Sequence, residues 1–435
     1  MKNQNEIIFS IIIPTFNSEK TISKSLRSVI SQKEKTEIIL VDDLSNDKTL
    51  SIIKKFKKKY KSIKIYKNTK NLGVSLTRNK GIKKAKGKYI IFLDSDDYLF
   101  NGCLQKLRTF IDKNKNPDVV FGRFEKETFP KNNDLIIKNL PKNTENKIAF
   151  KKLILKKKFP LDECWPYIVK REFLEINNIN FFNVRVAEDQ LYVLRIFLKM
   201  RSFYIFKDNF YCHRNLPGTL SDFMNFKYSK CCIEVVIEYL KLYKKEKNIL
   251  NKKLINQYIQ SCLSMFVGIF ITLQKNNIKE ISKILKRNNV RNYKVFFYKK
   301  ANLSFQSFVK KYGYFKGLLK LKQNIIQINK DKLKKFMDQK KEIYFLCYSK
   351  FLNASSVILG KKWKLVKFIL DENKSLNGRK FKGKIIINPK KILNNINYAN
   401  KIIVINNHRE ITIKKIINYL LKNKFPKKNI ATMNY

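Results

Sequence analysis

Short runs of β-branched residues alternate with amphipathic segments along the first part of the chain. The runs that predict strands are residues 7–13, 37–41, 63–66, 89–93 and 118–124. Between the first two runs, Ile22, Leu26 and Val29 fall on one face of a helix. This alternation is typical of βαβ units, so the pattern predicts an α/β fold with a mainly parallel sheet.

The pattern changes twice further along the chain. Residues 222–338 show helical periodicity only, and residues 339–435 return to strand-like runs separated by helix-like or loop segments. The strand-like runs of this last part are residues 343–347, 365–370, 384–387 and 401–405. We therefore predict three domains: an α/β domain at 1–221, a helical unit at 222–338 and a small Rossmann-like α/β domain at 339–435.

Lysine and arginine outnumber the acidic residues by 93 to 34, which gives the 435-residue chain a formal charge of +59. Hydrophobic residues make up 44%, enough for a folded protein. Because lysine recurs at every kind of position, we attribute part of the charge to codon usage. The rest is a solvated surface or a site for an anionic partner, either a membrane or a polyanion. No zinc finger, KH loop or aromatic RNA-binding motif is present, so nucleic acid is not expected.

The cysteines and the apolar runs indicate in which compartment the protein works, and the small number of histidines limits which metal ions it can bind. The seven cysteines form no C-x-x-C pair, and no apolar run reaches the ~20 residues of a membrane span. The apolar run before Pro14 is too short for a signal peptide, so we expect a cytoplasmic protein. With only His213 and His408, a histidine-rich zinc site is excluded, and any metal should be a hard ion on carboxylates.

Acidic residues follow two of the predicted strands directly. Strand 37–41 runs into Asp42-Asp43, and strand 89–93 runs into Asp94-Ser95-Asp96-Asp97. Parallel sheets bind ligands outside the carboxyl ends of their strands, and clustered carboxylates repel one another unless a cation offsets the cost. The pattern predicts a site for Mn²⁺ or Mg²⁺, although a short acidic turn taken alone is more often a solvated cap.

Three segments of the first hundred residues carry the most specific signal. They read IIIPTFNSEKTISKSLRSVISQ, EIILVDDLSNDKT and NLGVSLTRNKGIKKAKGKYIIFLDSDD. In this order they resemble the nucleotide-binding half of family 2 glycosyltransferases. The resemblance implies a catalytic domain of the GT-A fold, which is Rossmann-like, and a nucleotide-sugar donor.

The resemblance also implies which residues bind the nucleoside. Pro14, Thr15 and Asn17 match the loop that lies against the nucleoside. Asp43 matches the acid that accepts a hydrogen bond from the base, which is typically uracil. A UDP-sugar is therefore the expected donor.

The rest of the expected donor site lies in the third segment. Arg78 matches the arginine beside the nucleotide, although Thr77 replaces the family's alanine. Asp94, Ser95 and Asp96 form the D-x-D turn, and Asp94 and Ser95 are expected to bind the donor. Asp96 is expected as the direct metal ligand, with Asp94 nearer the ribose. Asp42 and Asp97 are left as caps or turn residues.

The segment FNVRVAEDQLY, residues 182–192, is similar to the E-D segment of the family, in which the second acid is the catalytic base. We therefore expect Asp189 to be the base and Glu188 to lie on the acceptor side. The alternative is ordinary capping, because acidic residues favour the first turn of a helix.

The segment YCHRNLPGTLS, residues 211–221, resembles the part that closes over the diphosphate in related enzymes. Arg214 is expected to pair with phosphate oxygens. His213 is expected as a metal ligand or a phosphate contact, with a packed or surface histidine as the alternative. Trp165 is an acceptor-facing aromatic or a core residue.

These residues predict an inverting, metal-dependent glycosyltransferase. It would move a sugar from a UDP-sugar to a hydroxyl of a saccharide or lipid-linked acceptor. The resemblance implies synthesis of bacterial surface polysaccharide, such as capsule or lipooligosaccharide. An oligomer is compatible with the sequence.

Residues 290–325 interleave aromatic residues with lysines. One interpretation is a helical core with a lysine face. The other is an interfacial helix whose lysines meet anionic headgroups. The second interpretation predicts peripheral association with the inner face of the bacterial cytoplasmic membrane.

Two other classes of protein remain as alternatives. A nucleotidyltransferase would carry a glycine-rich phosphate loop after its first strand, where this chain has Pro14-Thr15-Phe16-Asn17. A non-catalytic sugar-binding or polyanion-binding protein would lack an acid of the D-x-D or E-D motif, and all of them are present.

Overall fold

The computed structural model describes most of the N-terminal half of the chain and parts of the remainder. The described residues are 6–126, 151–152, 155, 163–184, 187–214, 226–290, 297–298, 303–304, 311, 314–337, 342–347, 352–370, 380–387, 401–406, 417–418, 420–421, 425, 427 and 430–432. They form two compact units, Met1–Leu216 with Glu246–Ile255, and Pro217–Lys245 with Asn256–Tyr435. The three-domain division expected from the sequence stays a prediction.

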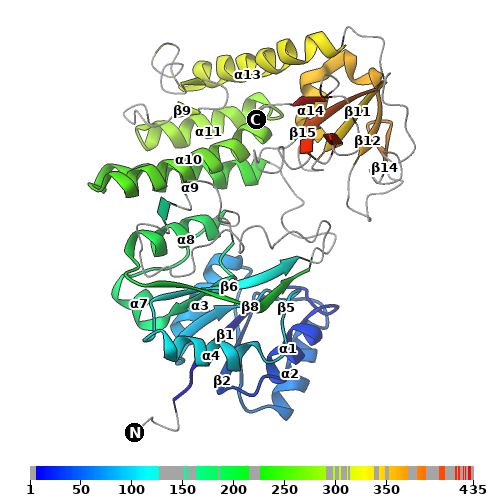
Figure 1. Ribbon diagram of the computed structural model, residues 1–435. Coiled ribbons are helices and arrows are strands. Elements are labelled where there is room, and N and C mark those ends of the chain that lie inside the picture. The colour runs from blue at the N-terminus through cyan, green and yellow to red at the C-terminus, as the bar shows by residue number, and fades with distance from the viewer. Residues whose placement is uncertain are drawn as a thin grey trace. The chain divides into compact units, whose positions relative to one another are not determined.

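The N-terminal unit is built on an eight-stranded sheet in the order β3-β2-β1-β4-β7-β6-β8-β5. Figure 1 labels β1, β2, β5, β6 and β8 of this sheet. Its strands are β1 (Phe9–Thr15), β2 (Thr36–Asp42), β3 (Ile63–Lys67), β4 (Tyr89–Phe92), β5 (Tyr98–Leu99), β6 (Val119–Lys126), β7 (Tyr167–Lys170) and β8 (Phe203–His213). Strands β3, β2, β1 and β4 pair in parallel, whereas β7 is antiparallel to both β4 and β6. The predicted mainly parallel α/β sheet is confirmed.

Helices of the N-terminal unit connect and cover these strands. They are α1 (Ile22–Ile30), α2 (Thr49–Lys59), α3 (Val74–Lys84), α4 (Cys103–Lys113), α7 (Arg171–Ile176) and α8 (Glu188–Lys199). Helix α3 lies close against β1 at Gly81. A Cβ atom at this position would come within 2.4 Å of Ile12 Cγ2, so the packing requires a residue without a side chain. This close packing holds the first turns of α3 over the carboxyl ends of the central strands.

The central strands are mostly apolar and almost entirely buried, as expected where both faces of a sheet are covered. Every residue of β1 and β4 is buried, Pro14 included. The parallel register aligns Thr15 of β1 with Asp42 of β2, and Ile12 with Phe92 of β4. The segments that follow these three strands therefore begin at one edge of the sheet.

The rest of the chain contains helices and a second sheet. The helices are α9 (Phe226–Lys245), α10 (Ile249–Phe270), α11 (Lys275–Arg287), α13 (Tyr314–Met337), α14 (Leu352–Leu359) and the 3₁₀ helix η5 (Gly360–Leu365). Within the segment expected to be purely helical, β9 (Phe297–Tyr298) and β10 (Leu303–Ser304) form a short antiparallel pair. Aromatic residues such as Phe297 and Tyr298 favour strands, and this local preference explains why a strand occurs in a segment that was expected to be helical.

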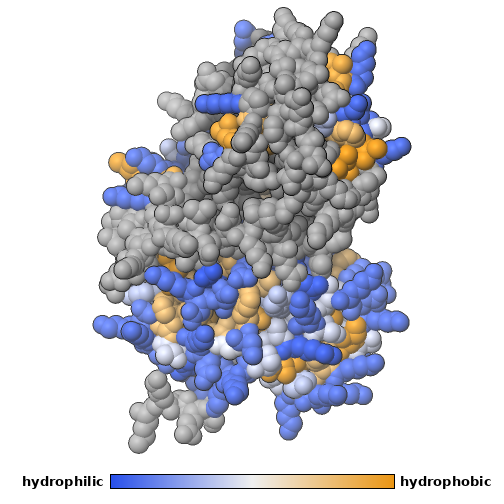
Figure 2. All heavy atoms as spheres, turned by 45° about the vertical axis from the view of Figure 1, so that its right-hand side comes forward, coloured by the Kyte–Doolittle hydropathy of each residue, from blue (hydrophilic) through white to orange (hydrophobic). Residues whose placement is uncertain are grey.

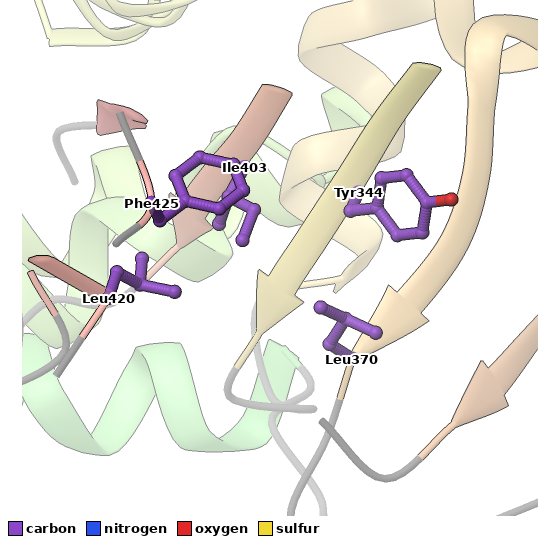
Figure 3. Close-up of a cluster of buried hydrophobic side chains, with 5 residues drawn as sticks. All are labelled: Tyr344, Leu370, Ile403, Leu420 and Phe425. Carbon is purple, nitrogen blue, oxygen red and sulfur yellow. The ribbon is translucent and has the colours of Figure 1, made fainter. Parts of the chain in front are cut away.

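The second sheet has six strands in the order β13-β14-β12-β11-β15-β16. They are β11 (Glu342–Cys347), β12 (Val366–Leu370), β13 (Lys380–Phe381), β14 (Lys384–Ile387), β15 (Lys401–Asn406) and β16 (Ile430–Thr432). Strands β14, β12, β11, β15 and β16 are parallel, as a Rossmann-like domain requires. Figure 3 shows the buried cluster on this sheet, formed by Tyr344, Leu370, Ile403, Leu420 and Phe425.

The surface of the N-terminal unit agrees with the interpretation that the excess lysines form a solvated surface. In the view of Figure 2, hydrophilic side chains cover much of this unit, with apolar side chains scattered between them. Single exposed apolar residues are normal on folded proteins. This is the pattern of a solvated surface.

Candidate active site

The site is built on the segments that leave β1, β2 and β4. The amide of Asp43, just past β2, donates to the carbonyl of Thr15 at 2.8 Å. Asn17, past β1, accepts from the amide of Asn46 and donates its own amide to Ser45 Oγ, both at 3.0 Å. Asn17 also has a positive φ of 49°. These bonds hold the two expected nucleoside loops together.

Asp43 is buried, and its carboxylate is fixed by three donors. Asn68 Nδ2 and the amide of Leu72 donate to Oδ1, and the amide of Gly73 donates to Oδ2, each at 2.8 Å. Asn68 Nδ2 also lies 3.1 Å from Thr77 Oγ1. The Thr77 hydroxyl, where the family has alanine, therefore belongs to the network that orients the expected base-binding acid.

Arg78 of α3 joins the acids of the two predicted motifs. Its Nη2 lies 2.9 Å from Asp94 Oδ1, and its Nη1 lies 2.6 Å from Asp189 Oδ1 and 3.0 Å from Glu188 Oε1. The residue is only 4% exposed. One buried cation thus brings the D-x-D turn and the E-D segment to the same place.

Aromatic rings enclose this guanidinium. Its Cζ lies 5.3 Å from the ring centre of Phe181 and 6.0 Å from that of Phe92. Burial opposes the positive charge, but Asp189, Asp94 and Glu188 outweigh it and raise the pKa of Arg78 above its ordinary value. Arg78 therefore stays protonated and keeps the three acids in place. The sequence placed it beside the nucleotide but did not reveal this bridging role.

Asp189 and Glu188 open helix α8, as the sequence predicted. Asp189 Oδ2 also accepts from the amide of Cys164 at 3.1 Å. Burial raises the pKa of Asp189 above its ordinary value, although Arg78 opposes the shift. Burial and the neighbouring Asp189 raise the pKa of Glu188 to about 8. This pair of carboxyl groups is therefore more basic than exposed acids, as a proton acceptor near neutral pH should be.

The D-x-D turn follows β4. Ser95 Oγ lies 2.8 Å from Ser18 Oγ, which ties the turn to the loop after β1. Burial and the negative charges of Asp94 and Asp97 raise the pKa of Asp96 to about 7. A cation beside Asp96 would offset the repulsion between its carboxylate and those of Asp94 and Asp97. The carboxylate oxygens of the turn are the type of ligand that a hard divalent ion prefers.

Over the described residues, no group of three or more His, Cys, Asp or Glu side chains is arranged to hold a metal ion. A divalent ion at this turn would therefore depend on Asp94 and Asp96 together with oxygens of a bound diphosphate. Such a division of ligands is usual for Mg²⁺, which binds through one or two carboxylates and substrate phosphates.

Asp97, which the sequence left as a turn residue, is fully buried and anchors the end of β8. It accepts from the Tyr211 hydroxyl at 2.5 Å and from the amide of Arg214 at 2.7 Å, and its Oδ2 lies 3.1 Å from His213 Nδ1. Its burial among polar partners is visible only in the fold. The D-S-D-D run was the sole sequence signal for it.

Three further predicted residues lie around Asp97. Arg214 Nη1 donates to the carbonyl of Asp96 at 3.1 Å, so its guanidinium reaches the D-x-D turn. Trp165 is 3% exposed and stacks on Tyr211 and His213, with ring centres 4.5 and 5.5 Å apart. This burial matches the core-packing alternative for Trp165, and its acceptor role stays a prediction. The segment expected to close over the diphosphate, residues 215–221, lies outside the described residues.

Comparison with known proteins identifies similar sequences. Residues 10–170 match the family model described as Glycosyl transferase family 2. A cholesterol galactosyltransferase of Borreliella burgdorferi is 34% identical over 49% of this chain and 61% of its own. A poly(ribitol-phosphate) beta-glucosyltransferase of Bacillus spizizenii is 33% identical over 46% of this chain and 31% of its own. TarP of Staphylococcus aureus, a poly(ribitol-phosphate) beta-N-acetylglucosaminyltransferase, is 31% identical over 46% of this chain and 60% of its own. The chain thus spans about a third to three fifths of the length of these relatives.

A solved structure has the same fold. Residues 1–349 of S. aureus TarS, crystallised with UDP-GlcNAc, superpose with a TM-score of 0.53 and 21% identity. The superposition covers 74% of this chain and 92% of that one. This likeness supports the fold class predicted from the sequence.

Proposed function

We propose that the protein transfers a sugar from a nucleotide-sugar to an acceptor hydroxyl, because residues 10–170 match the model of glycosyl transferase family 2, the family that the sequence resembles. The observation that carries the proposal is the Arg78 bridge. It places Asp94 of the donor motif and Asp189 of the E-D motif on one guanidinium. A donor bound at the D-x-D turn would therefore lie next to the expected base.

The proposed reaction is a single displacement with inversion at the anomeric carbon. Asp189 takes the proton from the acceptor hydroxyl as that oxygen attacks, and the nucleoside diphosphate leaves. Burial favours this role because it raises the proton affinity of the Asp189 carboxylate. Arg78 and the Cys164 amide hold the carboxylate in one orientation. Glu188, on the same guanidinium, is proposed to face the acceptor.

Asp94 and Asp96 would hold Mn²⁺ or Mg²⁺, with His213 as a candidate further ligand. When bound, such an ion neutralises charge that develops on the leaving diphosphate. Arg214 is proposed to pair with the same phosphate oxygens, since its guanidinium already lies at the carbonyl of Asp96.

We propose a UDP-sugar as the donor and a saccharide or lipid-linked acceptor in bacterial surface polysaccharide synthesis, such as capsule or lipooligosaccharide. The buried Asp43 with its fixed carboxylate supports recognition of a base. The names of the relatives support the acceptor class, because they include poly(ribitol-phosphate) and cholesterol transferases. TarS was crystallised with UDP-GlcNAc, which supports uridine.

Peripheral association with an anionic membrane stays a prediction from the sequence. No helix within the described part of the chain is long and apolar enough to cross a bilayer. Half of residues 290–325, on which the prediction rests, lies outside the described residues.

A screen of sugar nucleotides tests the proposed function directly. Purified protein with MnCl₂ is expected to gain thermal stability with one nucleoside diphosphate, because a ligand that binds only the folded state raises its stability. Slow, metal-dependent hydrolysis of the matching sugar nucleotide should accompany this gain. Failure of every sugar nucleotide to stabilise the protein or be hydrolysed would contradict the proposal.

The pH dependence of turnover should show the raised pKa of the base. Protonated Asp189 cannot accept the acceptor's proton, so kcat/KM should fall as pH falls through that pKa. Because burial raises this pKa, we expect the acid limb above the range near 4 that is ordinary for aspartate. Rates measured from pH ~4 to ~9 at saturating metal provide the test. Undiminished activity down to pH ~4 would contradict the assignment.

The C-terminal sheet is expected to be dispensable for donor chemistry, since every residue assigned to the site precedes residue 222. A chain ending at residue 338 should keep UDP binding and sugar-nucleotide hydrolysis, measured by calorimetry and by release of UDP. Far-UV circular dichroism and a cooperative thermal transition serve as the control for folding. A folded truncation that no longer binds UDP would show that residues 339–435 belong to the donor site.

A further inference from the structure

The Asp97 cluster, formed by Asp97, Trp165, Tyr211, His213 and Arg214, has a role that the proposed reaction does not yet use. The Asp97 carboxylate is 0% exposed and lies far from its partners in sequence. Two donors reach it, the Tyr211 hydroxyl at Oδ2 and the Arg214 amide at Oδ1, and His213 Nδ1 lies 3.1 Å from Oδ2. A buried carboxylate with these donors is satisfied without any ligand.

The cluster also holds both acids of the D-x-D turn through their backbone. The amide of Asp94 donates to the Tyr211 hydroxyl at 3.2 Å, while that hydroxyl donates to Asp97. Arg214 Nη1 donates to the carbonyl of Asp96 at 3.1 Å. The end of β8 and the turn after β4 are therefore joined around one carboxylate.

His213 is held on two sides. Its ring stacks on Trp165 at an interplanar angle of 14°, and its Nδ1 lies 3.1 Å from Asp97 Oδ2. The side chain is still 30% exposed, so part of it remains accessible to solvent. Ring position and ring rotation are both set by neighbours that the chain itself provides.

An ionised carboxylate only accepts hydrogen bonds, so the bond to Asp97 requires a proton on Nδ1. Neutral His213 then carries its lone pair on Nε2. Histidines that bind metals commonly donate their other ring N–H to a carboxylate in this way, and that partner fixes the tautomer.

We propose that Asp97 is a positioning residue that fixes His213 as the Nδ1-protonated tautomer and so presents Nε2 to the divalent ion bound with the donor diphosphate. This inference rests on the proposed function for the ion and the diphosphate. The tautomer itself is a property of the free protein.

Nitrogen NMR of the imidazole rings tests the tautomer without any substrate. The chain has only two histidines, so a His408→Gln variant assigns both spectra. At pH ~8, where an ordinary imidazole is neutral, His213 is expected to be protonated at Nδ1. In Asp97→Asn the amide NH₂ can donate to the ring, so the proton should move to Nε2. A wild-type ring protonated at Nε2 would overturn the proposal, and so would an unchanged tautomer in a folded Asp97→Asn variant.

Calorimetry with UDP and MnCl₂ tests the consequence for binding. Loss of a partner that orients a metal-binding histidine typically costs 10–100-fold in affinity or activity, so Asp97→Asn should weaken Mn²⁺-dependent UDP binding by at least ~10-fold. In a His213→Ala background the same substitution should cost much less, because the two residues act through one contact. Equal losses in both backgrounds would overturn the proposal.

Glu37→Gln is the matched control, since Glu37 is another buried acid of this unit, bonded to Ser10 and Lys64. It should leave UDP affinity unchanged. If wild type binds no UDP with Mn²⁺, the proposed function fails, and the NMR result still decides the tautomer. If Asp97→Asn does not fold, the wild-type spectrum alone confirms or excludes the Nδ1-protonated ring.

Discussion

Replacement of Asp189 by asparagine is expected to lower turnover by at least ~100-fold while UDP binding is retained, because general-base groups contribute ~10²–10⁴-fold. The amide has nearly the shape of the carboxylate, and its single oxygen can still accept from one of the two donors, Arg78 or the Cys164 amide, which contact Oδ1 and Oδ2 of Asp189 at 2.6 and 3.1 Å. It cannot take a proton. The loss should therefore appear in kcat, measured with a sugar nucleotide and acceptor, and not in UDP affinity measured by calorimetry.

Asp208→Asn is the matched control for this substitution. Asp208 lies in β8 of the same unit, its side chain is 55% exposed, and it pairs with Lys106 at 3.8 Å. An exposed pair of this kind contributes little, so stability and turnover should be unchanged. Wild-type turnover in Asp189→Asn would show that the E-D segment only caps α8. Loss of UDP binding together with turnover would assign Asp189 to the donor site.

Replacement of Asp96 by asparagine should abolish Mn²⁺-dependent UDP binding and leave the fold intact. Hard divalent ions bind charged oxygen ligands, and a neutral amide cannot replace the charge. Burial next to Asp94 and Asp97 already raises the pKa of Asp96 to about 7, so removal of this charge relieves repulsion in the free protein. The variant should therefore unfold at the wild-type temperature or above it.

Calorimetry with UDP, with and without MnCl₂, measures this effect. Since the ion must displace the proton of Asp96, wild-type affinity should also rise with pH through about 7. Asp208→Asn again serves as the control and should bind as wild type does. Unchanged Mn²⁺-dependent affinity in Asp96→Asn would remove Asp96 from the metal site.

The Arg78 bridge explains why the proposed donor and base motifs can act together. Helix α3 supplies the guanidinium, the turn after β4 supplies Asp94, and α8 supplies Glu188 and Asp189. A buried charge without partners is costly, so any arrangement that separated these acids from Arg78 would be unstable. The same ion pairs that stabilise this unit thus bring the two motifs to one point.

Local sequence was sufficient for the elements and for the chemistry at their ends. The apolar runs predicted β1 to β4, β6 and four strands of the C-terminal sheet, because burial of a strand or a helix face leaves a period that a short window reveals. The acids after β2 and β4 were found from their position directly after predicted strands, and the E-D pair at the start of α8 from the resemblance to family 2 glycosyltransferases. Each belongs to one element, and its position in that element is a local property.

The partners of those residues were decided by the tertiary structure alone. Arg78 meets Asp189 across 111 positions, and Tyr211 meets Asp97 across 114. Strands β5, β7 and β8, which complete the sheet, were not among the strands predicted from the sequence. Contacts over such separations depend on strand order and register, which arise from the packing of the whole unit and not from any window of sequence. For this reason the sequence predicted the acids of the proposed site, whereas only the fold showed that Arg78 joins Asp94, Glu188 and Asp189 and that Asp97 contacts His213.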